Sequence, residues 1–304
     1  MKVVGGSGER SRAEEERERS SLLPFAFLLL PSAKRRFISI LMTTLMAACA
    51  LFAVAVLLVI LGYIAARGVG AISLEFLTSA PMPVGEGGGI GNGIVGTLML
   101  IALSSIIGLP LGVAVGVYLA EFGSNRFGHA VRFVADTLTG VPSIVVGVFV
   151  YTVIVVPAGH FSALAGGVAL SIIMIPIVAR TTEEMIRLVP TSLREGALAL
   201  GAPQWRVTTG VVLPAAAPGI TTGAMLAVAR VSGETAPLLF TALNYRFFSR
   251  DIFQPVASLT VQIYNYAISP YDEWHSLAWA ATLVLMTLIL VINIAVRLLT
   301  RKRI

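Results

Sequence analysis

Six long apolar segments dominate this sequence and restrict what the chain can fold into. They cover roughly residues 38–64, 94–119, 131–156, 161–180, 214–240 and 277–298. About 20 apolar residues cross a bilayer as a helix, and the runs are continuous rather than alternating, which argues against a strand barrel. Of the 304 residues, 56% are hydrophobic and only 12% are charged. We therefore predict an all-α membrane protein with six transmembrane helices.

The positive charges lie unevenly around these segments. With the N-terminus in the cytoplasm, 18 of the 22 Lys and Arg residues fall on the cytoplasmic side, and only Arg67, Arg246 and Arg250 fall outside. The remaining one, Arg230, lies within the fifth segment. Cytoplasmic loops of membrane proteins carry an excess of Lys and Arg, so both termini are predicted to be cytoplasmic. The net charge of +6 is then a topology signal, and no nucleic-acid partner is expected.

Composition and hydropathy divide the chain into five parts. These are a disordered cytoplasmic tail (1–36), a first transmembrane helix (37–66), a periplasmic Gly-rich loop (67–93), a transmembrane domain (94–298) and a basic cytoplasmic tail (299–304). The domain includes a cytoplasmic segment, 181–213, and an outer loop, 241–276. The apolar stretch 22–31 lacks a small-residue cleavage site. We interpret it as a membrane-surface segment or as the product of an early start codon.

Several kinds of enzyme site are absent from the sequence. The glycine-rich stretch GEGGGIGNG lacks the lysine that a phosphate-binding P-loop requires, and Lys2, Lys34 and Lys302 lie in no such motif. The three histidines are far apart, and Cys49 is the only cysteine, so neither a metal site nor a nucleophile–base pair is indicated. We therefore expect no catalytic residues, no metal site and no ATPase site within this chain.

The second apolar segment carries small residues at every fourth position. They are Ser104, Gly108, Gly112, Gly116 and Ala120. Residues four apart share one helix face, and small side chains let another membrane helix approach closely. We therefore predict a tight helix–helix seam along this face.

Four of the predicted spans contain an internal proline: Pro110, Pro142, Pro176 and Pro237. Within a membrane, prolines persist where neighbouring helices or a water-filled cavity satisfy the freed carbonyls. The prolines therefore favour a helix bundle around a pathway over a passive membrane anchor.

The fifth segment contains an unusual pair of charges, Arg230 and Glu234. Charged groups in the bilayer are costly and usually functional. If this helix begins near Pro214 to Pro218, Arg230 lies about 18–24 Å along it, near the middle of the membrane. The spacing of four places both residues on one helix face. Two interpretations stay open: an internal ion pair that fixes helix packing, or a pair that lines a translocation pathway.

The cytoplasmic segment between the fourth and fifth spans is too polar to cross the membrane, but it has a helical pattern. Leu193, Ala197, Leu200 and Gly201 recur at helical spacing. Pro190 precedes a plausible helix start, and Pro203 ends the helix. We predict a short amphipathic helix at the membrane surface whose exposed face docks into a groove of a partner.

This segment resembles the cytoplasmic signature of permease subunits in ATP-binding-cassette (ABC) importers. The signature reads Glu-Ala-Ala, three residues, Gly, nine residues, Ile, one residue, Leu-Pro. The chain has Glu195-Gly196-Ala197, then Gly201, then Val211, then Leu213-Pro214, with matching spacing throughout. Gly196 and Val211 depart from the signature but keep its small or apolar character. The resemblance implies a type I ABC importer permease fold, with this segment as the coupling helix that sits in a cleft of an ATPase subunit.

Four further stretches are similar to the PstA-type subunits of bacterial phosphate importers. They are VRFVADTLTGVPSIVVGVFVY (131–151), PIVARTTEEMIRLVPTSLREGALALGAP (176–203), SGETAPLLFTALN (232–244) and SPYDEWHSLAWA (269–280). The likeness covers roughly residues 70–300, and SGETAPL is its most specific part. Permeases for sulfate or phosphonate are the nearest alternatives. A secondary anion carrier is a more distant one, because it would not need the coupling-segment spacing.

The resemblance also implies partners and a location. The chain would lie in the bacterial cytoplasmic membrane among lipids and pair with a PstC-like second permease. A PstB-like ATPase dimer would use ATP and Mg, so that this chain binds no cofactor itself. A PstS-like binding protein, periplasmic or lipid-anchored, would deliver inorganic phosphate.

With phosphate as the expected substrate, the charged pair acquires a specific interpretation. A guanidinium suits an anion with several acceptor oxygens, so Arg230 would contact phosphate. Glu234 would hold Arg230 while the path is empty, or accept a proton from phosphate. Arg180 and Ser143 are further pathway candidates, with interface anchoring and helix packing as their alternatives.

Overall fold

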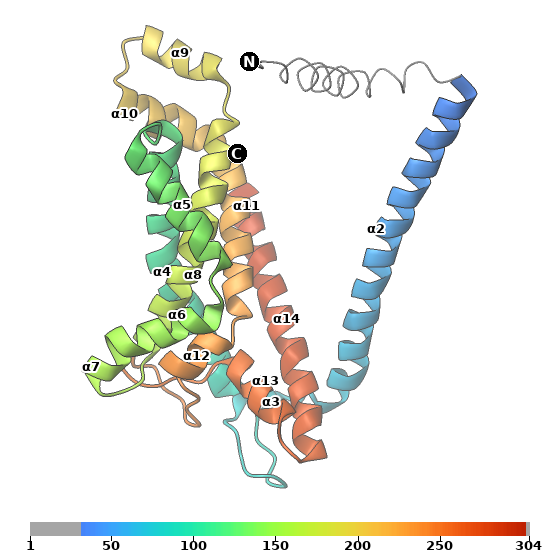
Figure 1. Ribbon diagram of the computed structural model, residues 1–304. Helices are drawn as coiled ribbons and strands as arrows, with labels where there is room; N and C mark the ends of the chain where they lie inside the picture. Colours follow the sequence, from blue (N-terminus) through green and yellow to red (C-terminus); the bar gives the residue numbers. More distant parts are fainter. Residues whose placement is uncertain (1–31, 302–304) are drawn as a thin grey trace, which may run out of the picture. The chain divides into compact units, whose positions relative to one another are not determined.

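A computed structural model describes residues 32–301 of the chain (Figure 1). Most of the predicted N-terminal tail, including the stretch 22–31, and residues 302–304 of the predicted C-terminal tail lie outside the described residues. The chain divides into two compact units, Met1–Tyr63 and Ile64–Ile304. In the first unit, the described residues belong to the single apolar helix α2 (Ser32–Gly68). This helix contains the first predicted span and begins within the predicted tail.

In its described part, the second unit consists of helices joined by loops, with one isolated bridge between Pro81 and Gly88. Its elements are η1 (Val69–Ala71), α3 (Leu74–Thr78), α4 (Gly91–Glu121), α5 (Arg126–Gly140), α6 (Ser143–Val150), η2 (Tyr151–Val155), α7 (Val156–Ala158), α8 (Ala163–Arg187), α9 (Thr191–Ala199), α10 (Gln204–Val207), η3 (Thr208–Val212), α11 (Leu213–Ser232), α12 (Ala236–Thr241), α13 (Leu259–Ala267) and α14 (Asp272–Arg301).

The small residues of α4 form the predicted seam, and α8 is the helix that packs into it. Gly108 lies against Met174, Gly112 against Val178 and Gly116 against Thr182. A Cβ atom at Gly112 would lie 2.7 Å from the Cβ of Val178, so only glycine permits this approach. Because the residue numbers rise together on both helices, α4 and α8 run parallel.

Because α4 and α8 run parallel, the chain between them must return across the bundle. This return adds one crossing to the count. Helices α5 and α6 supply this crossing as a broken span, bent by 104°. The break falls at Val141 and Pro142, where Val141 is extended, because a residue before proline avoids the helical region. Together with the five continuous helices that are long and apolar enough to span, the bent pair gives six candidate crossings in the described chain. The prediction of six spans is confirmed, although the third is sharply bent rather than straight.

Helix α11 runs antiparallel to α8, with Gly219 against Met185 and Gly223 against Thr181. The continuous helical segment begins at Gln204, earlier than the expected start near Pro214. The π-helical turn η3 precedes Pro214, and such turns adjust the hydrogen-bond ladder locally. The helix ends at Ser232 rather than near residue 240, because Gly233 and Pro237 interrupt it. A buried core that includes Leu170, Met174, Ala227 and Val231 joins α8 and α11.

The two ends of this unit differ in structure (Figure 1). One end carries α9, and we call it the coupling end. The opposite end carries α3, α12 and α13. The predicted amphipathic helix is present as α9, directly after Pro190 and before Pro203. The outer loop predicted over 241–276 contains the helix α13, which the sequence pattern did not predict.

Candidate translocation pathway and coupling segment

Arg230 and Glu234 form an ion pair at the end of α11. Nη2 of Arg230 lies 3.6 Å from Oε1 of Glu234, and their side chains are 62% and 15% exposed. The spacing had predicted that both residues lie on one continuous helix face. The helix ends at Ser232 instead, so Glu234 lies in the break before α12. The hydroxyl of Thr260, on α13, donates to the Glu234 carbonyl at 3.0 Å and holds this break in place.

The depth of Arg230 follows from the contacts between α11 and α8. Gly219 faces Met185 and Gly223 faces Thr181. Extending this antiparallel register by seven residues places Arg230 level with Met174, near the middle of α8. The long N-terminal part of the α10–α11 segment extends past the end of α8 toward the coupling end. Arg230 therefore lies near the middle of the helix bundle.

Ser143 lies close to the same break, through the packing of α6 on α12. Gly147 of α6 faces the Cα of Pro237 so closely that an added Cβ atom would lie 2.6 Å from it. Ser143 precedes Gly147 by four residues and lies on the same face of α6. The half-buried Ser143 is therefore on the α6 face that packs toward α12, the short helix that follows Glu234.

Arg180 is not part of this group. In the register of α8 and α11, Arg180 is level with Ala224, six residues from Arg230, which corresponds to about 9 Å along the helix axis. Its guanidinium is shared between two carboxylates, with Nε 3.2 Å from Glu184 and Nη1 3.7 Å from Glu183. The structure thus pairs Arg230 with Glu234, places Ser143 one helical turn before the contact of Gly147 with Pro237, and places Arg180 nearer the coupling end.

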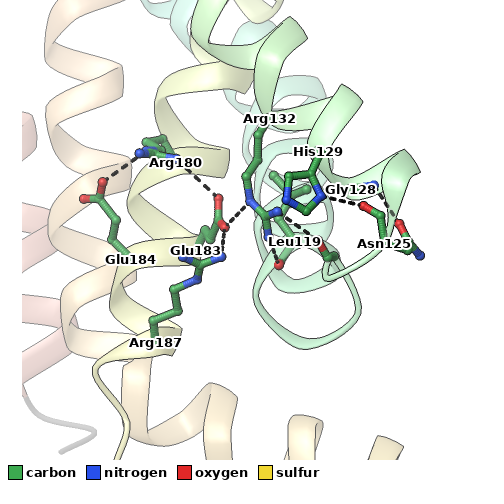
Figure 2. Close-up of polar contacts among 10 residues, drawn as sticks. Leu119, Asn125, Gly128, His129, Arg132, Arg180, Glu183, Glu184 and Arg187 are labelled. Carbon is green, nitrogen blue, oxygen red and sulfur yellow. Dashed lines mark hydrogen bonds and ion pairs between the residues drawn. The ribbon is translucent and has the colours of Figure 1, made fainter. Parts of the chain in front are cut away.

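Figure 2 shows the cluster that surrounds Glu183, which the sequence pattern did not reveal. The Glu183 side chain is only 1% exposed, and its Oε1 lies 2.7 Å from Nε of Arg132 and 2.6 Å from Nη2 of Arg187. Burying a carboxylate is costly unless it is paired. The spacing of Arg180, Glu183 and Arg187 would have indicated pairs on one helix. Nothing in the sequence pattern indicated Arg132, on α5.

Arg132 also contacts the C-terminal end of α4. Its Nη1 donates to the carbonyl of Gly123 at 2.8 Å and its Nη2 to the carbonyl of Leu119 at 2.6 Å. The last carbonyls of a helix have no partner within the helix, and a cation at this end is favourable. One guanidinium therefore joins α5, the end of α4 and the buried carboxylate on α8.

The residues of the predicted coupling segment lie along α9 and the turn after it. Glu195 and Gly196 are exposed and Ala197 is half-buried. Gly201 has a φ of +80°, and its N–H donates to the Leu198 carbonyl at 2.9 Å. The next N–H, of Ala202, donates to the Ala197 carbonyl at 3.3 Å. This is a Schellman end, which favours glycine at the left-handed position, and it explains why the motif has Gly201.

The Leu-Pro end of the motif lies at the start of α11. Leu213 packs on a buried cluster that includes Ile186, Val207 and Val212, and Ala197 packs on the same cluster. Pro214 follows directly after the π-helical turn η3, inside the continuous helical segment, and such a turn adjusts the hydrogen-bond ladder locally. The two ends of the motif thus rest on one apolar cluster at the coupling end, while Glu195 and Gly196 face outward.

The exposure of Arg230 indicates what this residue can bind. The Arg230 guanidinium has five N–H donors and is mostly exposed, with Glu234 near Nη2, so it can present donors to an oxyanion. Among the described residues, no group of three or more His, Cys, Asp or Glu side chains is placed to hold a metal ion.

Comparison with known proteins identifies the family. Residues 112–304 match the family model described as "Binding-protein-dependent transport system inner membrane component". The "Phosphate transport system permease protein PstA" of Yersinia pestis is 47% identical over 239 residues, 78% of this chain and 81% of the relative. The protein of the same name from Xylella fastidiosa is 45% identical over 274 residues, 89% of this chain and 96% of the relative.

A solved structure of the MetNI methionine ABC transporter, in an inward-facing conformation, has a TM-score of 0.56 and 22% identity to this chain. The match covers 70% of this chain and 93% of that chain. At this identity the likeness shows the fold alone, and it confirms the expected type I ABC importer permease fold. With six crossings, the chain is a multi-pass protein of the inner membrane. It belongs to the family of binding-protein-dependent transport system inner membrane components and, within that family, to the PstA-type permeases.

Proposed function

We propose that this chain is a membrane-spanning permease subunit of an ATP-driven importer that carries inorganic phosphate across the cytoplasmic membrane. The observation that carries the proposal is the 45% identity, over 89% of the chain, to a protein named as a phosphate transport permease. The spacing of the coupling segment and the exposed Arg230 are consistent with this role. The coupling end would face the cytoplasm, and both termini would lie on that side.

In this proposal, the break between α11 and α12 is part of the translocation path. Arg230 lies near the middle of the bundle and offers a guanidinium whose fork suits a tetrahedral oxyanion. Glu234 stands 3.6 Å from it and would hold Arg230 while the path is empty, or accept a proton from phosphate. Ser143 contributes a hydroxyl on the α6 face that packs toward α12. Arg180, paired with Glu183 and Glu184, would act closer to the cytoplasmic exit.

The energy for transport would come from partner chains. A PstB-like ATPase dimer would use ATP and Mg, while α9, with its exposed Glu195, would dock into a cleft of that dimer. A PstC-like permease would complete the path, and a PstS-like binding protein would deliver phosphate. This chain would then supply no catalytic residue. Its contribution would be to bind phosphate, to line the path and to change conformation during transport.

Uptake in cells tests the substrate. Phosphate-starved cells lacking this chain would be given labelled phosphate at micromolar concentration, with labelled sulfate as the control. We expect the loss of phosphate uptake alone, restored by the wild-type chain. Loss of sulfate uptake with unchanged phosphate uptake would contradict the proposal and assign the chain to another oxyanion.

A further inference from the structure

The coupling helix α9 has little contact with the helix bundle. It contains no buried residue, and it lies across the coupling end of the bundle (Figure 1). Its apolar contact is limited to partly buried side chains such as Ala197, which packs on the cluster around Ile186. Because α9 packs weakly on the bundle, it could move without moving the bundle helices. Any displacement that reaches those helices must therefore pass through specific side-chain contacts.

Arg194 makes such a contact, and it reaches two different helices. Its Nη1 forms a short ion pair with Oε1 of Glu121, the last residue of α4, and its Nη2 donates to the Ile186 carbonyl of α8 at 2.8 Å. The Arg194 side chain is 23% exposed and that of Glu121 only 6%. Shielding from water strengthens such a pair, and the planar guanidinium fork holds both acceptors in fixed directions.

A second arginine, Arg132, also joins the ends of α4 and α8. Arg132 of α5 donates to the carbonyls of Leu119 and Gly123 at the end of α4 and to the buried Glu183 of α8. Two arginines therefore link the paired ends of α4 and α8. One comes from the coupling helix and the other from the helix that leads to the broken span.

The paired ends are continuous with the rigid seam of α4 and α8. Gly108, Gly112 and Gly116 bring the two helices too close to slide without clashes. Packed interfaces of this kind shift as units rather than deform gradually. A displacement applied to the end of the pair is therefore carried along both helices to the level of Arg230, which the register of α11 on α8 places at the height of Met174.

We propose that Arg194 is a positioning residue that ties the coupling helix to the paired ends of α4 and α8, so that movement of α9 is passed into the helix bundle. The proposal rests on the proposed function, because it assumes a partner ATPase that moves α9. Without the tie, α9 still docks and ATP is still hydrolysed, but less of that movement reaches the transport path.

The test uses the complete complex with its ATPase and second permease in proteoliposomes, supplied with binding protein and phosphate. Four forms are compared with wild type: Arg194→Gln, Glu121→Gln, the charge swap Glu121→Arg with Arg194→Glu, and the control Arg126→Gln. Arg126 is an exposed arginine on the same side, so its loss removes the same charge. The measured quantity is the number of phosphate ions imported per ATP hydrolysed, alongside recovery of the assembled complex.

We expect Arg194→Gln and Glu121→Gln to assemble and to lower the number of phosphate ions imported per ATP by about fivefold or more. This is the lower range of coupling between distant sites. The swap restores the ion pair with α4 but not the donor to the Ile186 carbonyl, so it should recover part of the wild-type ratio, and the control should keep all of it. A wild-type ratio in Arg194→Gln, or a swap no better than either single variant, would overturn the proposal. Failure of the wild-type complex to import phosphate with ATP would instead refute the proposed function.

Discussion

The buried carboxylate of Glu183 offers a quantitative test of the helix packing, through the variant Glu183→Gln. Glu183 is 1% exposed and contacts Arg132 at 2.7 Å and Arg187 at 2.6 Å. Contacts to charged groups contribute about 1.5–3 kcal/mol each, against about 0.5–1.5 kcal/mol for neutral hydrogen bonds. Glutamine keeps an acceptor oxygen but loses the charge, so two weakened contacts give a loss of about 2–3 kcal/mol.

This estimate lies below the range of about 3–5 kcal/mol for a buried pair that loses one partner entirely. The reason is that Arg132 keeps its two carbonyl acceptors, Leu119 on α4 and Gly123 just after it. At about 2–4 °C per kcal/mol, the midpoint of thermal unfolding should fall by about 4–12 °C. The midpoint is measured on the purified chain in detergent, as the temperature at which half of the monodisperse peak is lost in size-exclusion chromatography.

The neighbouring residue supplies the control. Glu184→Gln removes the same charge from the next position of α8, but the Glu184 side chain is 55% exposed and pairs with Arg180 at 3.2 Å. Exposed pairs contribute less than about 1 kcal/mol, so its midpoint should fall by less than about 4 °C. Equal shifts for the two variants would refute the reasoning that the buried cluster of Glu183 holds α5 to the α4–α8 pair.

Three further substitutions test the seam, the pathway and the coupling helix. Gly112→Ala places a Cβ atom 2.7 Å from that of Val178 and should destabilise the chain by about 1–3 kcal/mol. The control Gly62→Ala, whose Cβ atom would have nothing within 4 Å, should leave the stability unchanged. The thermal-unfolding assay described above compares the two variants. Arg230→Gln should lower phosphate uptake while the complex still assembles, and loss of assembly would instead assign Arg230 a packing role. Glu195→Lys should abolish uptake while the protein remains in the membrane, and normal uptake by that variant would contradict the docking role of α9.

Apolar length and helix-breaking residues predicted much of this fold. Proline at 190 and 203 bounded α9 correctly, and the ladder around Gly112 predicted the α4 seam. The ladder did not identify α8 as its partner, because Met174, Val178 and Thr182 are not small residues. The 104° bend at Pro142 was also beyond prediction. A proline indicates that a helix is interrupted, whereas tertiary packing sets the direction of the chain after it.

In the candidate site, too, the sequence indicated contacts between neighbouring residues but not contacts between distant ones. An ion pair was one of the two interpretations of the spacing of Arg230 and Glu234, and the structure contains that pair. Gly233 ends the helix between them, so they do not share a continuous helix face. The contact between Arg132 and Glu183 joins residues 51 positions apart. The contact between Arg194 and Glu121 joins residues 73 positions apart. Such pairs depend on how whole helices pack, and no local spacing indicates them.

The most direct test of the central claim asks which energy source drives phosphate through this chain. The complete complex would be reconstituted in proteoliposomes with binding protein and labelled phosphate outside, and uptake measured with ATP inside or with a proton gradient alone. We expect uptake with ATP, none with the gradient alone, and none with ATP when the complex lacks this chain. Uptake that follows the gradient without ATP would contradict the account and identify a secondary carrier.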